Sequence, residues 1–220
     1  MGDVLDFLRD PQNHFVRQTT TYLRLCAVPI AFSILIGLVL GVLVARRSFA
    51  AFVVVNLSGL VRAIPTLAFL AVVLPYLGIG FTPAVVALTA LGVPPVLLNT
   101  IAGLRGIDPA VIDSARGMGM TPRQVLTRVE VPLVLPVVAA GIRTAAVQIV
   151  ATAPLAALIG AGGYGDYILA GVNLLQRTPL LVGAGSVALL ALAVEVALAG
   201  VERAVTPAGL RVRGPTSSGA

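Results

Sequence analysis

The sequence contains no lysine and no tryptophan, and it has one cysteine and one histidine. A P-loop ATPase needs the lysine of its phosphate-binding motif, so any ATP-driven function requires an ATPase on a separate subunit. Cys26 alone cannot form an intramolecular disulfide, and with His14 as the single histidine, cysteine and histidine metal clusters are excluded. We therefore expect neither a metal site nor a bound cofactor in this chain.

Charged side chains are also scarce. They make up 11% of the 220 residues, and hydrophobic residues make up 58%, whereas a typical soluble domain has about 25% and 45–50%. The apolar blocks are long and lack period-two alternation, which favours helices over an outer-membrane barrel. The predicted fold class is an all-α integral membrane protein with about five transmembrane helices. The net charge of +6, with arginine as the only basic residue besides histidine, indicates membrane topology rather than nucleic-acid binding.

Five apolar stretches are long enough to cross about 30 Å of hydrocarbon. Pro65 predicts that the second stretch is one kinked helix, with two half-helices as the alternative. Pro94 and Pro95 predict an irregular turn within the third stretch. The five stretches are Leu23–Ala45, Ala51–Leu77, Pro83–Leu104, Pro132–Ile159 and Thr178–Val201.

The spans divide the chain into three regions. Residues 1–20 form a polar, external N-terminal segment, for which a short amphipathic helix before Pro11 is expected, with a loose tail as the alternative. Residues 21–203 form the membrane domain, and residues 204–220 form a tail expected to be disordered. Nine arginines fall on the side that holds residues 105–131 and the C-terminus, and four fall on the other side. Cytoplasmic loops carry an excess of basic residues. We therefore predict a multi-pass protein of the cytoplasmic membrane, with its N-terminus outside and its C-terminus in the cytoplasm.

The segment 105–131 is the one substantial polar stretch between predicted spans. Asp108, followed by proline, predicts the N-cap of a helix, and this helix is expected to end at Gly117–Gly119. Thr121 begins a capping-box pattern, so a second short helix is expected from there to Pro132. The many apolar residues in the segment indicate that part of it docks on the bundle or in the groove of a partner.

The same segment resembles the EAA loop of ABC importer permeases. That pattern is Glu-Ala-Ala, three residues, Gly, nine residues, Ile, one residue and Leu-Pro. The spacing is met in full here by Asp113-Ser114-Ala115, Gly119, Val129 and Val131-Pro132, with Asp for Glu, Ser for the first Ala, and Val for both Ile and Leu. The resemblance implies a type I importer permease whose cytoplasmic loop is the coupling helix that docks in a cleft of the ATPase. The implied coupling residues are Asp113, Ser114, Ala115, Arg116, Gly117, Gly119, Val129 and Pro132.

Further segments, among them Arg62–Ala68, Ala140–Ala145 and Ile159–Gly163, resemble permeases of the osmoprotectant type, which carry glycine betaine, carnitine or choline. This resemblance implies a chain that is not itself an enzyme. Its implied partners are an ATPase subunit that binds the ATP, an extracytoplasmic substrate-binding protein, and a second permease chain, identical or paralogous. A permease for methionine or another amino acid is an alternative, since methionine-importer permeases have a similar five-span core. A stand-alone secondary transporter or channel is an alternative from another class.

A few polar residues fall within the predicted spans, where a charge costs at least about 2.5–3.5 kcal/mol. Such residues line a translocation pathway or gate, or they form structural hydrogen bonds between helices. Glu195 is expected to pair with an arginine near the cytoplasmic edge. With no tryptophan and four tyrosines to form an aromatic cage around a quaternary ammonium, specificity is expected in the separate binding protein. The pathway candidates are Arg62, Pro65, Asn99, Arg143 and Gln148.

Overall fold

The structure is a computed structural model that describes residues 2–206, and every regular element in that range is helical. The long helices are α2 (Phe15–Ala45), α5 (Phe81–Arg105), α8 (Val131–Thr152) and α10 (Arg177–Val205). The shorter elements are α1 (Gly2–Arg9), α3 (Ser48–Ala63), α4 (Thr66–Leu77), α6 (Pro109–Gly117), α7 (Pro122–Val125) and α9 (Tyr164–Asn173), the 3₁₀ helices η1 (Pro11–Asn13) and η3 (Ala153–Ile159), and the π turn η2 (Leu126–Glu130). The tail predicted to be disordered lies, from residue 207 onward, outside the described residues.

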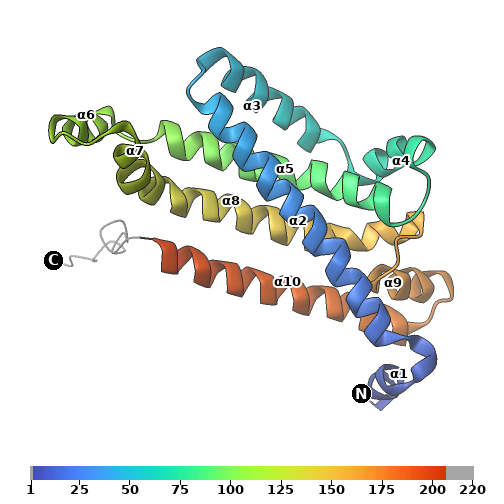
Figure 1. Ribbon diagram of the computed structural model, residues 1–220. Helices are drawn as coiled ribbons and strands as arrows, with labels where there is room; N and C mark the ends of the chain where they lie inside the picture. Colours follow the sequence, from blue (N-terminus) through green and yellow to red (C-terminus); the bar gives the residue numbers. More distant parts are fainter. Residues whose placement is uncertain (1, 207–220) are drawn as a thin grey trace, which may run out of the picture.

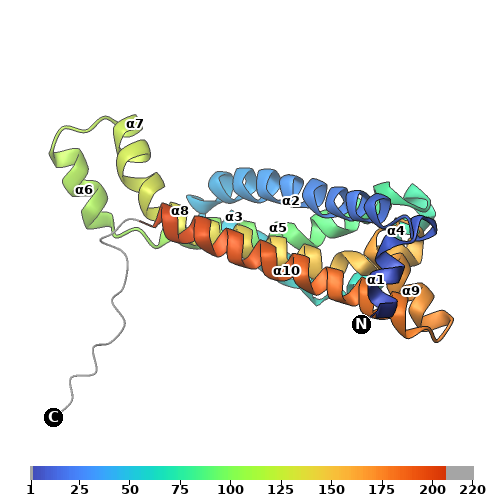
Figure 2. The same ribbon diagram turned by 90° about the horizontal axis from the view of Figure 1, so that it is seen from below.

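The long helices lie side by side, α3 lies along them beside α2 and α5, and the other shorter elements gather at the two ends of the bundle (Figures 1 and 2). The loop with α6 and α7 projects from one end, close to the last turns of α10. Helices α1, α4 and α9 lie at the opposite end. The polar loop and the start of the chain are therefore separated by the full length of the bundle, as an odd number of crossings requires.

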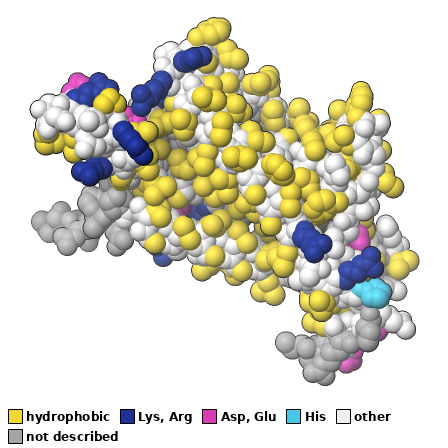
Figure 3. All heavy atoms as spheres, in the orientation of Figure 1, with side chains coloured by type: hydrophobic (Ala, Val, Ile, Leu, Met, Phe, Trp, Pro, Cys, Tyr) yellow, Lys and Arg dark blue, Asp and Glu magenta, His cyan; other side chains and the backbone are white. Residues whose placement is uncertain are grey.

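Four helical segments are long and apolar enough to cross a membrane: Phe15–Ala45, Phe81–Arg105, Pro122–Ile159 and Arg177–Val205. Helices α3 and α4 pass the same test as a bent pair, which gives five spans if the pair is one broken span. Apolar side chains cover the middle of the surface in Figure 3, and the arginines lie mostly toward the two ends. The predicted all-α membrane fold is confirmed.

Helix α5 is central and packs against α2 and α8. Glycines in α2 make the first of these contacts close: a Cβ at Gly37 would lie 2.7 Å from the Cβ of Val96, and one at Gly41 would lie 2.6 Å from the Cβ of Thr100. Helices in lipid associate through such van der Waals packing, because the surrounding acyl chains are as apolar as the side chains. The glycines therefore fix how α2 lies on α5.

The prediction of a single kinked helix for the second span is wrong. Helices α3 and α4 meet at 94°, so the observed form is the alternative of two half-helices. Pro65 lacks an N–H and holds Ile64 in an extended conformation, with φ −73° and ψ 122°. The irregular turn expected at Pro94 and Pro95 is also wrong. Both prolines are buried inside a continuous α5, and proline is tolerated in a membrane helix where neighbouring groups satisfy the backbone carbonyls that it frees.

Tyrosines tie the first helices to the end of the bundle that holds α9. Tyr22 donates its hydroxyl to the carbonyl oxygen of Val150 at 2.6 Å. Pro154, four residues further on, has no N–H for that carbonyl, so the tyrosine supplies a donor that the helix lacks. Burial raises the pKa of the Tyr167 phenol, and its protonated hydroxyl donates to the carbonyl oxygen of Asn13 at 2.6 Å. The N-terminal segment is thus packed onto the bundle.

Candidate ATPase-coupling site

Helix α6 forms the outer limb of the polar loop. Its N-cap is Asp108, whose carboxylate accepts a hydrogen bond from the N–H of Ala110 at 2.9 Å, and proline occupies its first turn. The helix ends where Gly119 adopts a left-handed conformation with φ +81°, which only glycine adopts without strain. The predicted cap and glycine break are both confirmed.

The inner limb of the polar loop consists of α7 and η2. It begins where the sequence predicts but does not end where the sequence predicts. Thr121 and Gln124 form a complete capping box. The helix was expected to stop before Pro132, but it continues through η2 into α8. At η2 the N–H of Val131 donates to the carbonyl oxygen of Leu126, five residues back. This π turn widens the helix at the point where the ring of Pro132 would otherwise clash with the carbonyl four residues before it.

The motif residues divide into an exposed and a buried set. Ala115 is 2% exposed, on the side of α6 that packs against α7 and η2. Val129 and Pro132 are half-buried at the base of the inner limb. The remaining members face solvent, together with Met118, which is 72% exposed. The exposed set is Asp113, Ser114, Arg116, Gly117 and Gly119. The loop therefore presents polar and apolar groups outward from a helix that projects beyond the spans (Figure 2).

The base of the loop holds charged contacts that the sequence analysis missed. Glu130, in η2, has a side chain only 8% exposed, and its two carboxylate oxygens lie 2.8 and 3.1 Å from Nη2 of Arg46. Arg105, the last residue of α5, donates its Nε–H to the carbonyl oxygen of Ala45 at 2.8 Å. The sequence signal was an acidic residue flanked by valines at the start of a span, which indicates a buried partner.

The pathway candidates are not brought together into one site. Arg62 is exposed in the last turn of α3, directly before the break at Pro65. Asn99 donates to the carbonyl oxygen of Pro95 in its own helix at 2.8 Å. Nη1 of Arg143 lies 2.8 Å from a carboxylate oxygen of Glu195, and its Nε lies 3.0 Å from a carboxylate oxygen of Glu202, also in α10. The expected pairing of Glu195 is confirmed. The side chain of Gln148 is half-buried on α8.

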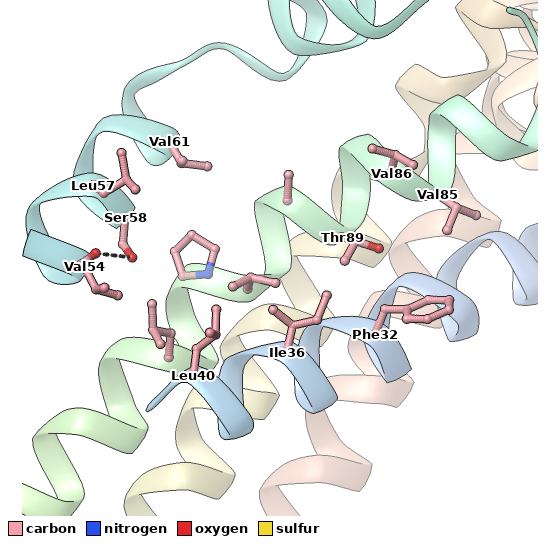
Figure 4. Close-up of a pocket in the computed structure, with 14 residues that line it drawn as sticks. Phe32, Ile36, Leu40, Val54, Leu57, Ser58, Val61, Val85, Val86 and Thr89 are labelled. Carbon is pink, nitrogen blue, oxygen red and sulfur yellow. Dashed lines mark hydrogen bonds between the residues drawn. The ribbon is translucent and has the colours of Figure 1, made fainter. Parts of the chain in front are cut away.

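A groove of about 590 Å³ opens between α2, α3 and α5 (Figure 4). Its walls are almost entirely apolar, with two hydroxyls among them. Ser58 donates its hydroxyl to the carbonyl oxygen of Val54 at 2.8 Å. The hydroxyl of Thr89 is buried and has no hydrogen-bond partner among the residues that the structure describes. None of the five pathway candidates lines this groove.

The chain combines a bundle of candidate membrane-spanning helices with a capped polar loop that projects from one end. The profile of the family described as "Binding-protein-dependent transport system inner membrane component" matches residues 33–207. The chain belongs to this family, and it is the inner-membrane permease of an ABC importer. As a binding-protein-dependent system, such an importer includes an ATPase and a binding protein. The chain is a multi-pass membrane component rather than an enzyme.

Two curated relatives match over nearly their whole length. The choline transport system permease protein OpuBB of Bacillus subtilis (strain 168) is 36% identical over 96% of this chain and 97% of its own. The carnitine transport permease protein OpuCB of Listeria monocytogenes is 38% identical over the same shares. Among solved structures, a chain of the inward-facing MetNI methionine ABC transporter superposes with a TM-score of 0.78 at 25% identity, covering 88% of this chain and 96% of that one.

Proposed function

We propose that this permease carries osmoprotectants of the quaternary ammonium class, such as choline, carnitine or glycine betaine, into the cell. Relatives with these substrates in their names match it over nearly their full length. The membrane domain, residues 21–203, provides the path, and the separate binding protein selects the substrate. The lack of tryptophan in the chain supports this division, since a cage for a quaternary ammonium uses aromatic rings.

The single observation that carries the coupling role is the projecting helix α6, capped at Asp108 and closed by the left-handed Gly119. Such a short, rigid helix can fit a groove on a partner and move as one body with it. In this proposal the loop 105–131 docks in the ATPase through Asp113, Ser114, Ala115, Arg116, Gly117 and Gly119, with Val129 and Pro132 supporting its base. Closure of the ATPase on ATP then displaces the loop and tilts the bundle.

A second permease chain, identical or paralogous, completes the pathway in this proposal. The support comes from the broken span. Backbone that is not helical is tolerated at membrane depth only where protein or water covers it. The break at Pro65 is exposed, and so is Arg62 beside it, although a charge facing lipid is costly. We therefore assign this face to the shared pathway, and Asn99, Arg143 and Gln148 to its supporting helices.

The orientation follows from the same reasoning. The loop must lie in the cytoplasm to meet the ATPase, and the C-terminal end of α10 lies at the same end of the bundle (Figure 1). The excess of arginine on that side agrees with the positive-inside rule. The N-terminal segment, residues 1–20, is then extracytoplasmic, on the side where the binding protein docks.

Reconstitution of the permease with the ATPase and the binding protein of its importer tests the proposal. Vesicles containing the complex should accumulate radiolabelled choline, carnitine or glycine betaine only when ATP and the binding protein are both supplied. Accumulation by the permease alone would identify a secondary transporter or channel instead and overturn the proposal.

The structural similarity to the methionine transporter chain favours methionine as a second candidate substrate. Thermal stabilisation of the cognate binding protein separates the two. A rise in Tm with choline or glycine betaine and none with methionine supports the osmoprotectant function. The opposite pattern supports the methionine function.

A further inference from the structure

Glu130 differs from the other charged side chains that the structure describes, because it is the one that is buried. A carboxylate removed from water is costly unless it is paired and hydrogen-bonded. Its partner, Arg46, remains 72% exposed, so the arginine reaches from the surface to the carboxylate. The pair joins two parts of the chain that are 84 residues apart in sequence.

The ion pair between Glu130 and Arg46 connects the coupling loop to the broken span. Glu130 lies in η2, at the base of the inner limb of the loop. Arg46 caps the C-terminal end of α2 and is followed, after one residue, by α3, the first half of the broken span. On the other limb, Arg105 leads into α6 and bonds to the last carbonyl of α2. Both limbs of the loop are therefore bonded to the same corner, formed by Ala45 and Arg46 between α2 and α3.

A polar cavity of about 180 Å³ lies between this corner and α6. It leaves room for α6 to shift relative to the corner, so the direct bonds, and not tight packing, link the loop to the bundle here. Its lining residues are Ala45, Arg46, Leu104, Ile112, Arg116 and Glu130. Glu130 also lies in the π turn η2, a rare form of helix that is frequently found at functional sites.

We propose that Glu130 is a positioning residue that, through Arg46, passes displacement of the coupling loop to the corner and so to α3. The inference rests on the proposed function, in which the ATPase displaces that loop. When the loop moves, the ion pair makes the end of α2 and the start of α3 move with it. Without the pair, the loop still docks on the ATPase, but its movement reaches the half-span less completely.

The test uses the whole importer in vesicles and compares Glu130→Gln and Arg46→Gln with wild type. Three quantities are measured: ATPase copurified per permease, ATP hydrolysis stimulated by the loaded binding protein, and substrate imported per ATP. A merely structural role lowers the amount of assembled complex and leaves the third ratio unchanged. We expect the ratio to fall about fivefold or more, the usual lower range of coupling between sites, with copurified ATPase preserved.

Two further variants sharpen the result. Arg46→Lys keeps the positive charge and should retain most of the ratio. Arg47→Gln removes the same charge from the exposed neighbouring position and should keep the wild-type ratio. An unchanged ratio in Glu130→Gln and Arg46→Gln, or an equal fall in Arg47→Gln, overturns the proposal.

If the glutamine variants do not assemble, Glu130→Asp decides the question, because it keeps the charge but shortens the reach to Arg46. An intermediate ratio supports the proposal, and a wild-type ratio overturns it. Failure of the proposed function looks different, since wild-type vesicles would then import no osmoprotectant. The ratio can in that case be measured with methionine, if methionine is the ligand that stabilises the binding protein.

Discussion

Gly119 offers a quantitative test of the coupling loop, because its backbone lies in the left-handed region at φ +81°. Replacing it with alanine should disfavour the observed turn by about 1–2 kcal/mol, the cost of this conformation for an L-residue. A Cβ at this position would meet no atom of the surrounding structure within 4 Å, so the cost comes from the local backbone conformation and not from a clash with neighbouring elements. That free energy corresponds to a roughly five- to thirtyfold change in the population of the turn.

The measurement is the affinity of the ATPase subunit for the permease in lipid nanodiscs. Because docking must restore the turn, the Kd of Gly119→Ala should rise by up to about thirtyfold. Gly119→Asn should lie between alanine and wild type, since asparagine adopts the left-handed region more readily than most residues. Gly185→Ala is the matched control, because a Cβ there also meets nothing within 4 Å and its position is helical, in α10 and outside the loop.

The result that would refute this reasoning is equal affinity of Gly119→Ala and Gly185→Ala for the ATPase. Both variants would first be shown to be monodisperse and equally stable to heat. Equal affinity would mean that the left-handed turn is not part of the docked conformation. It would also remove the main support for α6 as the docking element.

Two further predictions concern the bundle itself. Gly41→Ala should destabilise the permease by about 1–3 kcal/mol through overpacking against Thr100. Gly59→Ala should not destabilise it, because a Cβ there meets nothing within 4 Å. The Tm of each variant in detergent distinguishes the two, and equal Tm values would contradict the packing described. Tyr22→Phe should cost about 1–3 kcal/mol by leaving the carbonyl of Val150 without its donor. A Tm equal to wild type would show that another group supplies the hydrogen bond.

The local structure of the polar loop was the easiest part of the fold to predict, because the sequence patterns that mark its helix ends are local. Asp108 before a proline and the Thr121 capping box act over three residues or fewer, so the sequence contains all the groups involved. The contact of Glu130 with Arg46 could not be found in this way. Only the packing of α2 beside the start of α8 brings these two side chains together, and neither side chain has a partner nearby in sequence that signals the pair.

The prolines show why the shape of each span was harder to predict than the number of spans. Pro65 and the pair Pro94-Pro95 all remove backbone donors, and each predicts a bend when considered alone. Helix α5 stays continuous because α2 and α8 enclose it, so its prolines are buried in protein. Helix α3 has few buried residues and lacks such an enclosure, so the same chemistry at Pro65 ends the helix. The outcome depends on which neighbours a span has, and that is a property of the assembled bundle. It also follows that the broken span is the one whose backbone most needs cover from outside this chain.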